Sequence, residues 1–345
     1  MSELIKDRRN RRAVAIWLLV CCALVYGMVV LGGVTRLTGS GLSITDWQPI
    51  MGVLPPLNDV EWQGSFELYQ LSPEFQKINS HMSIEDFKGI FWLEYIHRLL
   101  GRAIGVVFLV PFLFFLAQGR IRKPEAPQYL LMFVLGGMQG LLGWYMVKSG
   151  LVDNPHVSQY RLTAHLLAAF AIYAYMFWIA LGLLFPAGSN RPHSLYRRTL
   201  ALTGLVTLTV VSGGFVAGLK AGLAFNSFPL MNGKWIPDQL LALEPAWRNL
   251  FDNLVTVQFN HRVLAIVTLG SVIAYWISAK GRQWPPRLTL GIHALLAVTT
   301  LQVILGIATL LLRVPVYLAA THQAVAMLVF TLMVYLCHGL RRADP

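Results

Sequence analysis

The stretch AVAIWLLVCCALVYGMVVLGG, residues 13–33, decides the fold class of this chain. It carries no charged residue, and about 20 consecutive apolar residues are what a helix needs to cross the hydrocarbon core of a bilayer. Seven further predominantly apolar stretches follow it, at residues 91–117, 128–148, 162–185, 199–219, 254–279, 289–311 and 318–340. We therefore predict an all-α integral membrane protein with eight transmembrane helices.

The composition agrees with this prediction. Of the 345 residues, 56% are hydrophobic and 13% are charged, whereas soluble domains carry about 25% charged residues. With the N-terminus in the cytoplasm, the inner segments hold sixteen Lys or Arg and four acids. The outer segments hold nine Lys or Arg, counting Lys148 at the end of its span, and eleven acids. Because basic residues stay on the cytoplasmic side, topology explains the net charge of +12 without a nucleic-acid partner.

The location follows from the same segments. Twelve residues precede the first span, too few for a transit peptide rich in arginine and serine. We expect a multi-pass protein of a bacterial inner membrane, in contact with membrane lipid, with both termini cytoplasmic.

An internal repeat divides the chain into two halves. GGVTRLTGSGLSITDWQPIMG begins at Gly32 and GGFVAGLKAGLAFNSFPLMNG begins at Gly213, each directly after or within the end of an apolar stretch. The second stretch contains EYIHRLLG and the sixth QFNHRVLA, while the third and seventh share Gln-x-x-x-Gly. Repeats in the same orientation are related by an axis along the membrane normal. We predict two pseudo-symmetric four-helix bundles.

These boundaries give five segments. Two bundles of four helices are joined by a short linker, and short cytoplasmic ends flank them. The first outer loop has about 57 residues, and loops of that length usually carry function, so we expect it to fold over the outer mouth of its bundle. The segments are the N-terminal segment 1–12, the N-terminal half 13–185, the linker 186–198, the C-terminal half 199–340 and the tail 341–345.

Four of the nine histidines occupy equivalent positions in the two halves. His97, His165, His261 and His322 lie on the second, fourth, sixth and eighth stretches, each within one or two turns of the outer end. Polar side chains inside a bilayer are costly and indicate a functional site by default. A single buried histidine is often a packed structural residue, but four at repeat-related positions favour function.

A pair of imidazoles from facing helices suits a haem iron, and a four-helix bundle can enclose the macrocycle. Zinc needs three or four protein ligands, which one pair per half does not supply. A proton relay would use further acids across the membrane, and Glu94 is the one acid within the predicted spans. The pattern predicts two haem sites.

Three charged residues near these histidines are candidate site residues: two arginines that recur in both halves and one acid that is present only in the first. Arg98 and Arg262 follow His97 and His261 and could bind haem propionates, although an arginine at this depth also occurs as an interfacial residue. Glu94 lies one turn before His97, where the second half has Gln258. A carboxyl group near an apolar pocket should resist ionisation and could transfer protons; the alternative is a structural acid.

The motifs EYIHRLLGR, NHR and GGVTRLTGSGLS, with the duplicated eight-span layout, resemble the haem A synthase family over nearly the whole chain. The long first outer loop resembles the alphaproteobacterial and mitochondrial branch. Other branches carry a cysteine pair in this loop, whereas Cys21, Cys22 and Cys337 all fall within predicted spans.

The resemblance implies a haem b cofactor on His261 and His322, and haem O as substrate between His97 and His165. It also implies that Glu94 is the functional acid. The implied reaction oxidises the C8 methyl group of haem O by successive hydroxylations to a formyl group, which gives haem A for terminal oxidase assembly. As partners we expect haem O synthase, an unidentified electron partner and a second copy of the chain in a homo-oligomer.

Two other functions use the same histidine pairs. A di-haem b-type membrane protein could pass electrons without changing a haem, and a transporter or chaperone could bind haem transiently. The difference between Glu94 and Gln258 favours the enzyme, because an electron-transfer protein needs no acid in one half alone.

Overall fold

The computed structural model describes residues 2–46, 53–185 and 194–341. In these ranges the regular secondary structure is helical, and eight helices are long and apolar enough to cross a membrane. The predicted fold class is therefore confirmed. Residues 186–193 of the predicted linker and 342–345 of the predicted tail lie outside the described residues. The eight spans belong to α1 (Ser2–Leu37), α3 (Ile84–Ala117), α4 (Ala126–Lys148), α5 (Gln159–Leu184), α6 (Tyr196–Gly218), α8 (Leu254–Ala279), α9 (Pro286–Leu311) and α10 (Val316–Arg341).

Two helices begin well before the predicted spans. α1 starts at Ser2, because the Lys, Arg and Glu residues of the predicted N-terminal segment are good helix formers and continue the helix inward. α3 starts at Ile84, where the Ser83 hydroxyl accepts from the Asp86 amide and the Asp86 carboxylate accepts from the Ser83 amide. This capping box is visible in the sequence and sets the start seven residues before the predicted residue 91.

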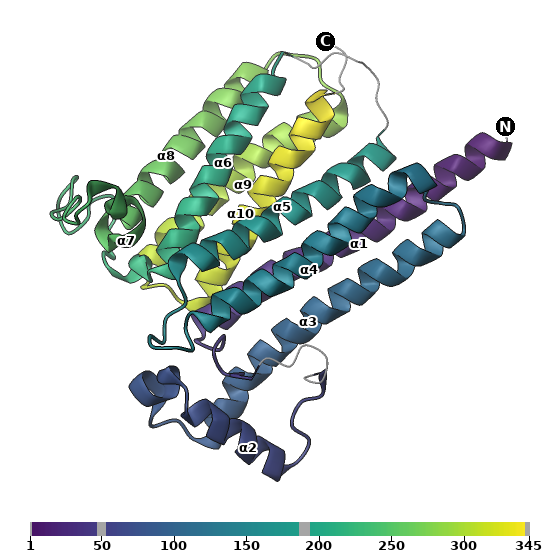
Figure 1. The fold of residues 1–345 in the computed structure, drawn as a ribbon. Helices are drawn as coiled ribbons and strands as arrows, with labels where there is room; N and C mark the ends of the chain where they lie inside the picture. The colour runs from purple at the N-terminus through teal and green to yellow at the C-terminus, as the bar shows by residue number, and fades with distance from the viewer. Residues whose placement is uncertain (1, 47–52, 186–193, 342–345) are drawn as a thin grey trace.

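The spans form two rings of four helices (Figure 1). In the first ring α1 and α4 each pack against both α3 and α5. In the second ring α6 and α9 each pack against both α8 and α10. The histidine-bearing helices of each ring, α3 with α5 and α8 with α10, are thus diagonal to one another, with the other two helices between them.

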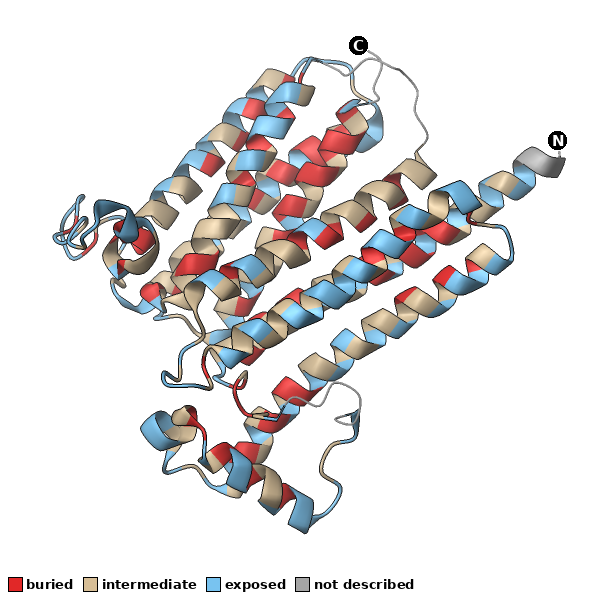
Figure 2. Cartoon of the chain, viewed as in Figure 1, coloured by how far each residue is buried: buried red, intermediate tan, exposed pale blue. Residues whose placement is uncertain are grey.

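The rings meet along α1 and α5 of the first and α6 and α10 of the second. Buried positions gather on α10 and α1, whereas α3 and α4 present many exposed positions (Figure 2). Across this contact the Gln323 side chain donates to the Val29 carbonyl at 2.7 Å, and the Tyr26 hydroxyl donates to the Ala324 carbonyl at 2.6 Å. Apolar residues on the exposed faces, such as Val106 of α3, are suited to contact lipid.

The long connections lie on one side of the molecule, opposite the start of α1 and the end of α10 (Figure 1). We call this side outer. The first connection holds α2 (Asp59–Gln70) and one turn of π-helix, η2 (Phe75–Asn79); the second holds α7 (Asn249–Asp252) and the short 3₁₀ turns η4 (Ala221–Leu223) and η5 (Ala246–Arg248). A further turn, η3 (Lys123–Glu125), precedes α4 on the inner side.

The first outer loop packs on the outer end of α3 through an aromatic cluster. Tyr69 and Phe87 stack with ring centroids 5.1 Å apart, and Trp62 meets Phe91 edge-on at 5.0 Å. Burying these rings stabilises the contact, since aromatic pairs add about 0.5–1.5 kcal/mol beyond their buried area. The described part of the first outer loop is therefore folded against the outer end of α3. The cluster comprises Trp62, Phe66, Tyr69, Phe87, Phe91 and Tyr95.

Candidate functional site

The four predicted histidines lie at matching positions in the two rings. His165, His261 and His322 stand six or seven residues after the first residue of α5, α8 and α10. His97 stands 13 residues after the first residue of α3, because α3 continues outward beyond the bundle. All four side chains are half-buried, so each keeps a partly open surface inside a packed helical ring.

Each imidazole packs against a glycine of a neighbouring helix. A Cβ atom built on Gly306 would lie 2.8 Å from Cε1 of His322, and one built on Gly213 would lie 3.2 Å from Cε1 of His261. The imidazoles thus occupy space that the side chain of any residue other than glycine would fill at these positions. The four pairs are His97 with Gly32 of α1, His165 with Gly143 of α4, His261 with Gly213 of α6, and His322 with Gly306 of α9.

The pairs combine into one site per ring. His97 and His165 lie on the diagonal helices α3 and α5 of the first ring, and His261 and His322 lie on the diagonal helices α8 and α10 of the second. Among the described residues no group of three or more His, Cys, Asp or Glu side chains is arranged to hold a metal ion. Two imidazoles from diagonal helices match axial ligation of a haem iron, and a closed zinc site would need more ligands.

Ser212 is a hydrogen-bond partner of His261. Its hydroxyl donates to the Thr209 carbonyl at 2.8 Å and lies 2.7 Å from His261 Nδ1. When the one hydroxyl hydrogen is donated to Thr209, the hydroxyl oxygen is free to accept from His261 Nδ1–H, and this tautomer leaves the Nε2 lone pair for a metal. Metal-binding histidines commonly have such a partner on the second nitrogen, which fixes the ring and raises its basicity.

His97 and His165 have no such partner, whereas His322 Nε2 lies 3.4 Å from the side-chain nitrogen of Gln302. Nδ1 of His97, His165 and His322 is buried without a hydrogen bond to any described residue. A buried polar atom without a protein partner indicates a ligand, ion or water that fills the role. Together with the glycine contacts, these atoms make the residues of both rings a suitable setting for haem.

Glu94 is fully engaged by its surroundings. Its carboxylate accepts from the Ser43 hydroxyl at 2.7 Å, from the Ile44 amide at 2.8 Å and from the Arg98 guanidinium at 2.6 Å. The side chain is 3% exposed. The expected apolar setting of this acid is therefore wrong, because the outer loop folds back and brings donors that the sequence pattern of α3 alone does not reveal.

Arg98 and Arg262 hold the outer loops in the same way in both halves. Arg98 donates to the Ile44 carbonyl at 2.9 Å, and Arg262 donates to the Phe225 carbonyl at 2.9 Å. Ile44 and Phe225 are themselves repeat equivalents, each 12 residues after the glycine that opens its repeat. Both guanidinium groups are engaged by the protein, so their binding of propionates stays a prediction.

Sequence comparisons agree with this architecture. Residues 15–334 match the COX15-CtaA family, described as cytochrome oxidase assembly proteins. The chain belongs to this family. The heme A synthase of Nitrosospira multiformis is 53% identical over 96% of the chain and 94% of its own length. That of Nitrosomonas eutropha is 49% identical over 97% and 96%, and heme A synthase COX15 of Arabidopsis thaliana is 45% identical over 96% and 75%.

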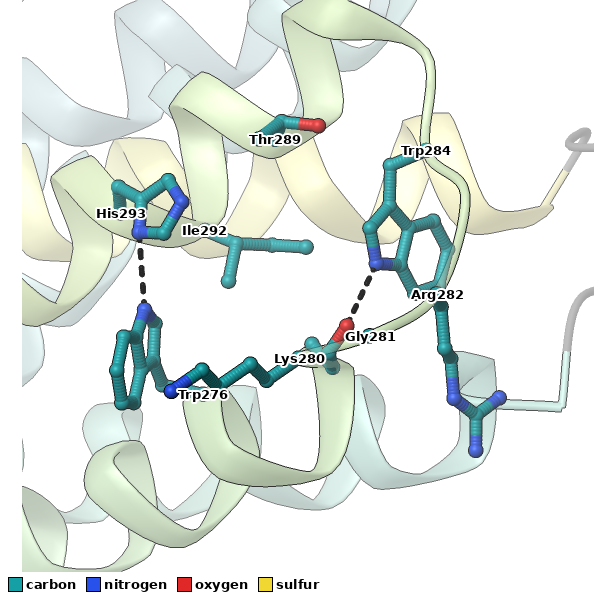
Figure 3. Close-up of a pocket in the computed structure, with 9 residues that line it drawn as sticks. Trp276, Lys280, Gly281, Arg282, Trp284, Thr289, Ile292 and His293 are labelled. Carbon is teal, nitrogen blue, oxygen red and sulfur yellow. Dashed lines mark hydrogen bonds between the residues drawn. The ribbon is translucent and has the colours of Figure 1, made fainter.

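A separate hollow in this COX15-CtaA protein lies between α8 and α9 at their inner ends (Figure 3). It has a volume of about 130 Å³ and is lined by Trp276, Lys280, Trp284 and His293, among others. Trp276 follows His261 by 15 residues on α8, a rise of about 22 Å. We assign the hollow no part in the histidine sites.

Sequence reasoning about the COX15-CtaA chain missed two kinds of site residue. The glycines were visible as repeat matches, but their contact with the imidazoles depends on which helices are neighbours. Ser212 precedes Gly213 by one residue, and nothing in the sequence except its hydroxyl group in an apolar stretch indicates a role at the site.

Proposed function

We propose that this chain is a haem A synthase, which oxidises the C8 methyl group of haem O through successive hydroxylations to the formyl group of haem A. The proposal rests on one observation above all. Each half of the chain contains a repeat-related pair of half-buried histidines, and each histidine is seated on a glycine. The relatives named heme A synthase share up to about half of their residues with it over nearly the full length.

The N-terminal ring is proposed to receive haem O between His97 and His165. The two imidazoles would hold the substrate iron from opposite faces, since α3 and α5 are diagonal in the ring. The Cβ-free surfaces of Gly32 and Gly143 let the imidazoles approach the helices closely. The apolar tail of haem O suits entry from the lipid, because the faces of α3 and α4 are largely uncovered by protein.

The C-terminal ring is proposed to hold haem b on His261 and His322. When bound, haem b supplies one-electron chemistry, whose potential depends on the axial ligands and their hydrogen bonds. Ser212 supports this assignment, because its hydroxyl lies 2.7 Å from His261 Nδ1 and would orient the ring with Nε2 toward the iron. A resident cofactor benefits from a ligand held in this way, whereas a substrate has to leave.

Glu94 is proposed to hold and transfer a proton next to the substrate. Its Oε2 atom is 2.7 Å from the Ser43 hydroxyl, which can pass a proton between the carboxyl group and the outer loop. A positioned acid or base contributes about 10²- to 10⁴-fold to a rate. The ion pair with Arg98 keeps the group in place.

The orientation and partners are part of the same proposal. The excess of basic residues on the inner side supports an orientation with both termini in the cytoplasm of a bacterial cell. Haem O synthase would supply the substrate, and a separate electron partner would act with haem b. A homo-oligomer would bring two such units together.

Pigment analysis tests the proposal. The chain is expressed with haem O synthase in a host that lacks haem A, and extracted haems are separated by chromatography. A formyl-bearing haem in the wild type, absent in His97→Ala, is the expected result. Unchanged haem O with two bound haems would identify a di-haem electron-transfer protein, and reversible loading without product would identify a transporter or chaperone.

A further inference from the structure

Arg36 is a charged residue of the N-terminal ring to which the proposed function assigns no role. It lies in the last turn of α1 and is half-buried. Its guanidinium group makes no hydrogen bond or ion pair with any described residue, whereas Arg98 is paired with Glu94. A partly desolvated guanidinium group without a partner is costly and suits an anionic ligand with two oxygen atoms.

The register of α1 against α3 places Arg36 on the outer side of the histidine site. The two helices run antiparallel, with Met28 against Gly101 and Gly32 against His97. Four residues after Gly32, on the same face of α1, Arg36 lies opposite Leu93. It is therefore one turn, about 6 Å, further outward than His97, at the level of Glu94.

The acid at this level is not available to Arg36. Both oxygen atoms of Glu94 are bound, by Arg98 on one side and by Ser43 and Ile44 on the other. The repeat also shows that Arg36 is not needed for the architecture of a ring. Its equivalent on α6, counted from the opening glycine of each repeat, is Ala217.

We propose that Arg36 binds a carboxylate of the substrate in the N-terminal ring, above the iron ligand His97 on the outer side. An amphiphilic porphyrin bound between His97 and His165 places its carboxylates toward the polar outer end and its apolar parts toward the membrane. A planar guanidinium group binds such a carboxylate through two parallel hydrogen bonds. This inference rests on the proposed function, because it takes the N-terminal ring to be the substrate site.

Binding of porphyrins with and without carboxylates tests the proposal. The purified full-length protein with its C-terminal haem is titrated with iron protoporphyrin IX and with its dimethyl ester, and binding is followed by absorbance. The wild type should prefer the diacid. Arg36→Gln should weaken diacid binding about tenfold to a hundredfold, as expected for a lost charge-assisted contact, and should leave ester binding unchanged. Arg36→Lys should restore part of the affinity.

Control variants distinguish a failure of the Arg36 proposal from a failure of the proposal that the N-terminal ring is the substrate site. Arg248→Gln removes another outer arginine, one already paired with Asp252, and should change neither titration. If His97→Ala abolishes binding but Arg36→Gln does not alter the preference for the diacid, Arg36 has another partner, such as a lipid phosphate, and the inference is overturned. If no porphyrin binding depends on His97 or His165, the proposed function itself fails. Should Arg36→Gln not fold, equal wild-type affinity for diacid and ester overturns the inference.

Discussion

The two halves of the chain share one framework and differ where chemistry would differ. In both, an arginine after the iron-ligand candidate donates to an equivalent loop carbonyl. One turn earlier, Glu94 accepts from the amide of Ile44, whereas Gln258 donates to the carbonyl of Phe225 at 3.0 Å. The two equivalent loops are thus held by the Glu94 carboxylate in the first half and by the Gln258 amide in the second. The framework is present in both halves, but the carboxyl group is present only in the first.

A second difference lies beneath the histidines. His261 has Ser212 as a hydrogen-bond partner, while the equivalent position below His97 is Leu31. A side chain of the protein therefore orients His261 in the C-terminal ring, whereas Nδ1 of His97 in the N-terminal ring has no such partner among the described residues. Under the proposed function, this contrast would separate a permanent haem site from an exchangeable one through a few polar substitutions on one duplicated scaffold.

The largest expected effect separates the sites completely. His261→Ala and His322→Ala should each abolish the low-spin haem b spectrum, because a bis-imidazole site loses its coordination when either ligand is removed. His97→Ala should leave that spectrum in place. Absorbance spectra of the purified variants check this, and a normal haem b spectrum in both C-terminal variants would refute the assignment.

The next effect concerns the acid. Glu94→Gln should lower haem A formation by about 10²- to 10⁴-fold, while haem O or a hydroxylated intermediate accumulates. Because glutamine has one acceptor oxygen and would turn a donor toward Ser43 or Arg98, the loop contact should also weaken.

Haem b absorbance and thermal stability of Glu94→Gln, measured beside product formation, separate the two effects. Gln258→Glu should leave turnover nearly unchanged. A Glu94→Gln variant that makes haem A at the wild-type rate would show that the acid is structural.

A smaller effect is expected at Ser212. Ser212→Ala removes the acceptor for His261 Nδ1–H, and loss of such a partner typically weakens metal affinity by about 10- to 100-fold. Haem b should still bind but should be lost more rapidly to a haem-scavenging protein. Leu31→Ser, the reverse exchange, should slow haem release from the N-terminal ring. Equal release rates in the wild type and Ser212→Ala would remove the proposed distinction.

The smallest effect distinguishes the outer loops. Burial raises the pKa of the Glu74 carboxyl group to about 7, against the hydrogen bond from Tyr69 that lowers it. The second outer loop is held by neutral amides, such as that of Asn249, which donates to the Leu243 carbonyl at 2.7 Å.

Since the folded loop keeps the Glu74 proton to higher pH than the unfolded one, its stability should fall between about pH 4.5 and 7 and stay low above. The protection of the first loop against hydrogen exchange, taken relative to the intrinsic exchange rate at each pH, should therefore be lower at pH 8 than at pH 5, and Glu74→Gln should remove the difference. The second loop is the internal control.

Much of the architecture was predictable because membrane solvation constrains sequence strongly. A span must satisfy its backbone hydrogen bonds internally and present apolar residues to lipid, so eight long apolar stretches predict eight helices. Their ends differ from prediction chiefly at α1 and α3, where polar residues continue a helix beyond the bilayer. The capping box at Ser83 was readable, since it depends on local contacts only.

The sequence by itself determined the helical fold, the duplication and the four histidines, because repeats and apolar periods are properties of the chain read in order. Only the tertiary structure decided what these residues meet. The glycine beside each imidazole, the Ser212 contact and the Glu94 carboxylate surrounded by donors all join residues far apart in sequence. Arg36 likewise looks like any arginine at a helix end until the register of α1 against α3 places it on the outer side of His97. Such neighbours depend on helix packing and loop return, which no local pattern encodes.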